Sequence, residues 1–162
     1  MLTQDLLHEL FILDSEKGVL IARVDGVNRK KGQIVGTPAL GYWAISVNGK
    51  YYRRSRLIFC MVHGFFPKQV DHINRNSSDD RPENLRAATP SRNTANAKAK
   101  PRKHSLPRGV WKCHGRFQTR VTVNYKSIHL GTYDTPEEAH EAYRRGLKKY
   151  FGEFSPYAHL SE

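Results

Sequence analysis

The segment from residue 69 to residue 98 constrains the fold of this chain more than any other feature, because it places three polar motifs beside short apolar runs. In chain order the motifs are Asp71-His72-Ile73-Asn74, Glu83-Asn84-Leu85-Arg86 and Ser91-Arg92-Asn93-Thr94-Ala95-Asn96. They bring a carboxylate, an imidazole and several carboxamides together within one short stretch. Groups of these kinds suit a hard cation, a general base and a polyanionic partner.

The same segment predicts a strand, a loop, a second strand and a helix, in that order. Residues 69–73 and 85–88 have the composition of short strands, and the polar residues 74–82 between them are typical of a loop. Thr89 suits the N-cap of a helix and Pro90 its first turn. This order is that of a ββα unit, so we expect an α+β fold.

The charge of the chain indicates an anionic partner. The 162 residues include 27 Lys and Arg against 15 Asp and Glu, a formal net charge of +12. The excess is spread along the chain, with +5 over residues 1–97 and +7 over residues 98–162. Both parts are therefore suited to polyphosphate. The alternative is a basic protein whose charge only keeps it soluble.

Cysteine and apolar patterning exclude several other classes. Cys60 and Cys113 are the only cysteines, which excludes a disulfide framework, and no Cys-x-x-Cys pair is present for structural zinc. A reducing, intracellular setting fits this usage. No apolar stretch is long enough to span a bilayer, so we expect no membrane partner.

The residues before the motif segment predict a mixed set of short elements. The expected elements, in order, are a helix over residues 3–11, a strand over 18–23, an exposed basic loop over 25–41, a hairpin that turns at Asn48-Gly49, and a helix over 55–63. In the last of these, the spacing places Leu57, Ile58, Met61 and Val62 on one side.

Two residues of the first motif could divide the chemistry of phosphodiester hydrolysis. On a strand, Asp71 and His72 point to opposite sides. His72 is the natural general base, since an imidazole ordinarily titrates near neutral pH. Asp71 could bind a metal ion, and Asn93 on the following helix could complete the metal site from the other side. Such oxygen ligands suit Mg²⁺ or Mn²⁺ better than zinc. Taken singly, each of these residues is more often structural than catalytic.

The loop between the two strands carries four further polar residues. Asn76, Asp79, Asp80 and Glu83 do not have the spacing of a calcium-binding loop, and the bidentate glutamate is missing. We therefore expect a solvated loop.

The motif segment resembles the His-Asn-His (HNH) homing endonucleases of bacteriophages, in a His-Asn-Asn variant. The upstream stretches that share this resemblance are Leu10-Phe11, Gly18-Val19-Leu20, Gly41-Tyr42, Asn48-Gly49-Lys50, Arg56-Leu57 and Gly64 to Pro67. The resemblance implies a ββα-metal fold with Asp71 and Asn93 as metal ligands and His72 as general base. It also implies that Asn84 orients His72, and that the protein acts in the cytoplasm of a bacterial host if it is phage-encoded.

The last third of the chain has a different pattern. Residues 99–107 are basic and contain prolines, which predicts a linker. Residues 108–111, 116–124 and 127–133 predict three strands, and Thr135-Pro136-Glu137-Glu138 is the capping box of a helix. The helix spacing predicts a buried face of Ala139, Ala142, Tyr143 and Gly146 or Leu147, with Tyr150 a turn later.

Alternation along the second of these strands separates an apolar face from a polar one. The apolar face comprises Phe117, Thr119, Val121 and Val123, and the polar face Arg116, Gln118, Arg120 and Thr122. Arg and Gln side chains can pair with base edges in a major groove, although a solvated sheet face would show the same pattern.

Residues 108–152 resemble the plant ethylene-response-factor DNA-binding domain, which implies a three-stranded sheet in the major groove, backed by one helix. The contacts that it implies are Arg108, Trp111, Lys112, Arg116, Gln118, Arg120 and His129. Trp111, Cys113, Ser127 and His129 depart from the plant pattern, so the plant target sequence does not carry over.

The chain is therefore predicted to be a DNA endonuclease with an added DNA-binding module. The expected parts are a nuclease domain over residues 1–98 with its core at 69–98, a linker over 99–107, the module over 108–155, and a tail over 156–162. We expect duplex DNA as partner, one divalent cation (Mg²⁺, or else Mn²⁺) and, because one active site is predicted, a monomer. The alternatives are a DNA-binding regulator with an inactive nuclease core, and an RNA-binding or structural protein.

Overall fold

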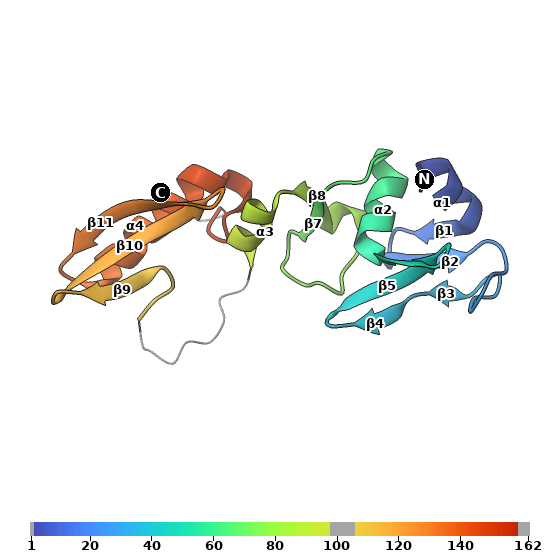
Figure 1. Ribbon diagram of the computed structural model, residues 1–162, viewed down its shortest axis with the longest axis horizontal. Helices are drawn as coiled ribbons and strands as arrows, with labels where there is room; N and C mark the ends of the chain where they lie inside the picture. The colour runs from blue at the N-terminus through green and yellow to red at the C-terminus, as the bar shows by residue number, and fades with distance from the viewer. Residues whose placement is uncertain (1, 98–105, 159–162) are drawn as a thin grey trace. The chain divides into compact units, whose positions relative to one another are not determined.

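The computed structural model describes residues 2–97 and 106–158, and the chain divides into two compact units, Met1–Ala88 and Thr89–Glu162 (Figure 1). The second unit starts before the predicted end of the nuclease domain at residue 98. The predicted linker lies outside the described residues except for Leu106 and Pro107. The functional boundaries therefore stay predictions.

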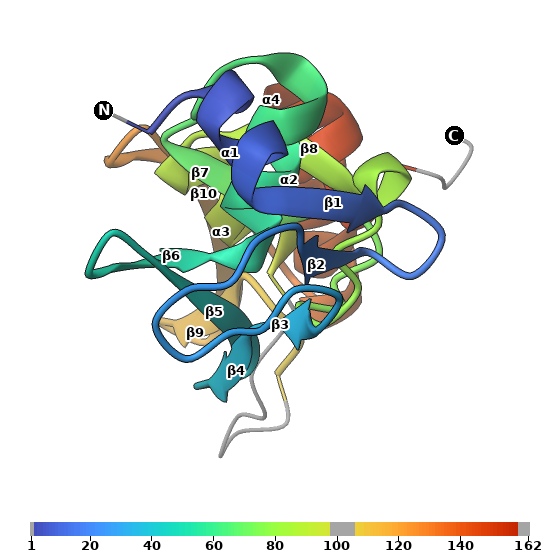
Figure 2. The same ribbon diagram turned by 90° about the vertical axis from the view of Figure 1, so that its right-hand side faces the viewer.

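The first unit contains two α-helices and small antiparallel sheets. Its elements are α1 (Gln4–Leu10), β1 (Phe11–Asp14), β2 (Val19–Ala22), β3 (Ile34–Val35), β4 (Thr37–Ala39), β5 (Tyr42–Val47), β6 (Lys50–Arg53), α2 (Arg54–His63), β7 (Gln69–His72), the 3₁₀ turn η1 (Pro82–Asn84) and β8 (Leu85–Ala88). The strands form the sheets β1-β2-β3, β4-β5-β6 and β7-β8. Figure 2 looks onto this unit.

Helix α2 forms the centre of the first unit, where it packs against α1 and against strands of all three sheets. Leu57, Ile58 and Met61 are buried, as the helical spacing predicts. Val62 is 44% exposed, so its predicted place on the buried side is wrong. Phe59 is buried there instead, because sheets and α1 surround α2 on several sides and bury more of it than one apolar stripe.

The basic stretch at residues 25–41 is not a continuous loop. It contains β3, which pairs with β2 through Leu20 and Val35, and β4, which pairs with β5 through Ala39 and Tyr42. These strands are two and three residues long and lie among Gly, Lys and Arg, so local composition hides them. Pairing with longer strands stabilises them. The partner of β3 lies apart from it in the sequence, whereas β4 and β5 are joined by a short turn.

The second unit is a three-stranded sheet packed on a long helix. Its elements are α3 (Pro90–Asn96), β9 (Val110–Cys113), β10 (Arg116–Val123), β11 (Lys126–Tyr133), α4 (Pro136–Phe151) and the 3₁₀ turn η2 (Gly152–Phe154). The sheet order is β11-β10-β9, all antiparallel. With four α-helices and small antiparallel sheets among the described residues, the predicted α+β class is confirmed.

Helix α4 begins and packs largely as its sequence predicts. Thr135 and Glu138 form the expected capping box. Gly146 allows the sheet to come close, since an added Cβ would lie 2.5 Å from Leu130 Cδ1. Phe151 is buried and Tyr150 is exposed, so the prediction that Tyr150 extends the buried face is wrong by one position. None of the helices in the described part of the chain is long and apolar enough to cross a membrane.

Candidate active site

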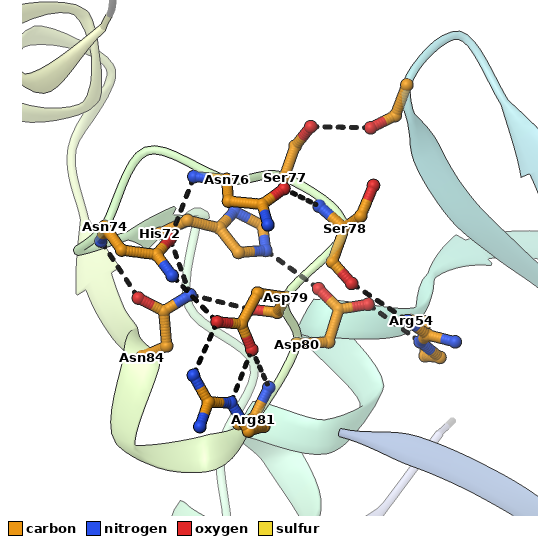
Figure 3. Close-up of polar contacts among 11 residues, drawn as sticks. Arg54, His72, Asn74, Asn76, Ser77, Ser78, Asp79, Asp80, Arg81 and Asn84 are labelled. Carbon is orange, nitrogen blue, oxygen red and sulfur yellow. Dashed lines mark hydrogen bonds and ion pairs between the residues drawn. The ribbon is translucent and has the colours of Figure 1, made fainter. Parts of the chain in front are cut away.

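A buried polar network in the first unit holds the imidazole of His72. Nε2 of His72 lies 2.8 Å from Oδ1 of Asp80, and Nε of Arg54 donates to Oδ2 of Asp80 at 2.7 Å (Figure 3). The exposed fractions are 8% for His72, 2% for Asp80 and 3% for Arg54. A carboxylate only accepts hydrogen bonds, so Nε2 carries the proton and Nδ1 carries the basic lone pair of the neutral imidazole.

Three elements bring these side chains together. His72 is the last residue of β7, Arg54 is the first residue of α2, and Asp80 lies near the end of the loop between β7 and η1. The Arg54 guanidinium also lies over the ring of Trp43 on β5, 5.0 Å from its centroid. A buried arginine needs such partners because an uncompensated charge is costly in the protein interior.

Asp80 was not predicted to belong to the site. The sequence indicates a solvated loop for Asn76, Asp79, Asp80 and Glu83, and this is wrong for Asp80, which is almost completely buried. Its neighbours are polar, so local composition conceals the burial. The available signal was Arg54, a charged residue at the start of an apolar helix that requires an acidic partner.

Asn84 contacts the loop between β7 and β8. Its Oδ1 accepts from the backbone N–H of Asn74 at 2.9 Å, and its Nδ2 donates to the carbonyl of Asp79 at 2.7 Å. The two contacts tie the start of this loop to its end. Asp80 contacts the imidazole of His72, and Asn84 supports the loop that carries Asp80. The predicted orienting role of Asn84 stays a prediction.

Hydrogen bonds from the backbone to asparagine side chains, together with one ion pair, fix the rest of the loop. Asn74 Oδ1 accepts from the backbone of Asn76, and Asn76 Oδ1 accepts from the backbone of Ser78. The Arg81 side chain donates twice to Asp79, and these hydrogen bonds hold the pKa of the Asp79 carboxyl well below its usual range. The same ion pair raises the pKa of Arg81.

Gly18 lies directly beneath the end of the loop. An added Cβ at this position would lie 2.4 Å from the backbone N of Arg81 and 2.6 Å from the backbone C of Asp80. Gly18 also has a φ of +63°, which favours glycine. The turn between β1 and β2 thus packs directly against the backbone of the loop that carries Asp80, and a larger residue at Gly18 would displace that loop.

Asp71, the predicted metal ligand, is fixed by the neighbouring strand. It is 3% exposed, pairs with Arg86 across β7 and β8, and its Oδ2 accepts from Nε of Arg86 at 2.8 Å. Asn93, the second predicted ligand, lies on α3 in the second unit. The sharing of one cation by Asp71 and Asn93 therefore stays a prediction.

The donor chemistry of these two residues fits a hard cation, since both offer oxygen. Among the described residues, no group of three or more His, Cys, Asp or Glu side chains could hold a metal ion. A Mg²⁺ ion does not require such a cage, because it is commonly bound through one or two carboxylates together with water and substrate phosphate.

Most of the predicted DNA contacts in the second unit share one face of the sheet. The strand registers place Trp111 opposite Gln118 and His129 opposite Arg120. The Arg120 guanidinium lies over the Trp111 ring, 5.0 Å from its centroid. Arg116 belongs to the same face by alternation and pairs with Asp134 at 2.8 Å. Together these groups form an exposed surface of donors and aromatic rings.

Two of the predicted contacts lie elsewhere. Lys112 is paired with Phe117, so it belongs to the opposite face of the sheet. The Arg108 guanidinium donates to the carbonyls of Ala97 and Thr94 at the end of α3. Arg108 therefore stabilises a helix C-terminus, where carbonyl groups lack intrahelical partners.

The stretch that carries these residues is similar to a family of nucleases. Residues 52–95 match the family model described as HNH endonuclease. The matched stretch contains His72, Asp80, Asn84 and Asn93, and it supports nuclease activity with DNA as the substrate. No curated protein and no solved structure matches the chain.

Proposed function

We propose that this protein is a metal-dependent DNA endonuclease of the homing type, in which His72 is the general base. The observation that carries the proposal is the buried His72–Asp80–Arg54 network inside the stretch that matches HNH endonucleases. An imidazole fixed by a buried carboxylate has a defined tautomer and orientation, which general-base catalysis requires.

The reaction is hydrolysis of one phosphodiester bond. Nδ1 of His72 takes a proton from a water molecule as the water oxygen forms a bond to phosphorus. The bond from phosphorus to the 3′ oxygen then breaks. Asp80 stabilises the imidazolium that results, because its carboxylate accepts from Nε2 and is held in place by an ion pair with Arg54.

We propose Asp71 and Asn93 as the ligands of one divalent cation, Mg²⁺ or Mn²⁺. When bound, such an ion stabilises the negative charge that develops on the leaving oxygen. Asp71 is held in a defined orientation by Arg86. The exposed sheet face of the second unit, with Trp111, Gln118 and Arg120, would supply affinity for duplex DNA and influence where cleavage occurs.

The experiment is cleavage of supercoiled plasmid by the purified full chain with Mg²⁺, with and without excess chelator. Nicked or linear product that requires the metal supports the proposal. Plasmid that is bound but intact over a range of divalent cations would instead indicate a DNA-binding regulator with an inactive nuclease core.

A further inference from the structure

The tip of the β4–β5 hairpin carries a leucine that the fold does not bury. Leu40 is 100% exposed and has a φ of +49°, in the left-handed region. Ala39 and Tyr42 pair directly, so Leu40 and Gly41 form a two-residue turn. Asn or Gly is favoured at such a position, because a left-handed backbone is unfavourable for leucine.

This tip is attached to the loop of the candidate active site. The Ser77 hydroxyl donates to the carbonyl of Gly41 at 2.6 Å (Figure 3). Ser77 lies in the loop between His72 and Asp80, and the carbonyl of the next residue, Ser78, accepts from Arg54. The apolar tip therefore has a fixed position relative to the network that holds the proposed base.

A cation lies beside the tip. The Arg53 guanidinium lies over the ring of Tyr42, 4.1 Å from its centroid, and Arg53 is exposed. Tyr42 directly follows the turn that contains Leu40. An exposed apolar side chain flanked by arginine is the combination that DNA-bending proteins use, with the apolar group between base pairs and the cation on phosphate.

We propose that Leu40 inserts between adjacent base pairs of duplex DNA next to the scissile phosphate, while Arg53 contacts the neighbouring backbone. The placement beside the scissile phosphate rests on the proposed function. Insertion unstacks one base step and so bends the duplex, which would help to present a phosphate to His72. An interaction with DNA would explain why a leucine occupies this unfavourable backbone position, where it makes no buried contact within the described part of the chain.

The test measures base unstacking in the absence of cleavage. The His72→Ala protein is footprinted on DNA, and duplexes of that site are made with 2-aminopurine at successive positions. We expect 2-aminopurine fluorescence to rise severalfold at one step when the His72→Ala protein binds. Adding Leu40→Gly should abolish this rise and weaken binding by about tenfold.

Two controls separate insertion from a structural role. Glycine accepts the left-handed backbone, so the Leu40→Gly chain is expected to unfold at the same or a higher temperature. Val27 is 90% exposed at another turn, and Val27→Gly should leave the fluorescence rise unchanged. Any of three results would overturn the proposal. The fluorescence rise could survive Leu40→Gly, it could be absent at every position, or it could be lost together with a lower unfolding temperature of the Leu40→Gly chain.

The outcome is distinguishable from failure of the proposed function. Absence of plasmid cleavage by the wild-type chain would contradict the nuclease assignment. The fluorescence measurement would still decide whether Leu40 inserts into DNA, because it does not depend on cleavage. Normal cleavage by Leu40→Gly with no unstacking at any step would contradict the insertion and leave the nuclease assignment intact.

Discussion

The carboxylate of Asp80 lies between His72 and Arg54, 2.8 Å from Nε2 of the imidazole and 2.7 Å from Nε of the guanidinium. One buried acid thus fixes the proposed base and is itself kept in place by a buried cation. Because the three residues belong to different elements, the arrangement depends on the folded unit as a whole.

Asp80→Asn is therefore expected to lower the cleavage rate by at least about tenfold while DNA affinity stays the same. The amide retains the shape of Asp80, but it cannot stabilise the imidazolium of His72 as a carboxylate does. Rates are measured as a function of pH under single-turnover conditions, with folding checked by circular dichroism. Glu83→Gln, an exposed acid in the same segment, is the matched control and should cleave normally.

Gly18→Ala is expected to destabilise the first unit by roughly 1–3 kcal/mol, because the added methyl group overlaps the backbone of Asp80 and Arg81. Gly49→Ala provides the matched control. Gly49 also has a positive φ, but no heavy atom of the described residues lies within 4 Å of an added Cβ. Urea unfolding of both variants separates steric overlap from backbone strain, and equal losses of stability would argue against the packing explanation.

The Asp79–Arg81 ion pair predicts a pH-dependent contribution to stability. The pKa of Asp79 is lowered by its hydrogen bonds to Arg81, so the contribution is complete above the ordinary Asp pKa of about 3.9 and is lost as the pH falls below it. Asp79→Asn should unfold at a lower temperature than wild type at neutral pH, and the difference should shrink below about pH 3. A difference that does not change with pH would contradict this assignment.

Arg120→Ala is expected to weaken duplex DNA binding by about tenfold, because Arg120 stacks on Trp111 in the middle of the exposed sheet face. Lys112→Ala removes an equal charge from the opposite face and should change affinity much less. Fluorescence anisotropy at two salt concentrations distinguishes a lost base contact from a lost phosphate contact. Equal effects of the two substitutions would mean that the sheet face is not the contact surface.

Local signals in the sequence predicted the elements that depend on neighbouring residues. The cap at Thr89 and the capping box of Thr135 with Glu138 form as expected. The turn at Asn48-Gly49 also joins the two predicted strands of a hairpin. In each of these cases the stabilising contacts lie within a few positions along the chain.

What the sequence did not reveal depends on long-range contacts. Asp80 meets Arg54 across 26 positions, so a polar loop composition gave no sign of a buried acid. β3 is stabilised by pairing with β2, where Leu20 lies opposite Val35. The resemblance to the ethylene-response-factor domain implied a DNA contact for Arg108 and gave no sign that its guanidinium contacts the end of α3, so the DNA contact stays a prediction.

The most direct test of the central claim compares wild type with His72→Ala on supercoiled plasmid with Mg²⁺, at protein concentrations that saturate the DNA. We predict that the variant binds as tightly as wild type and cleaves on the order of 10²- to 10⁴-fold more slowly. Cleavage by His72→Ala at the wild-type rate would contradict the account.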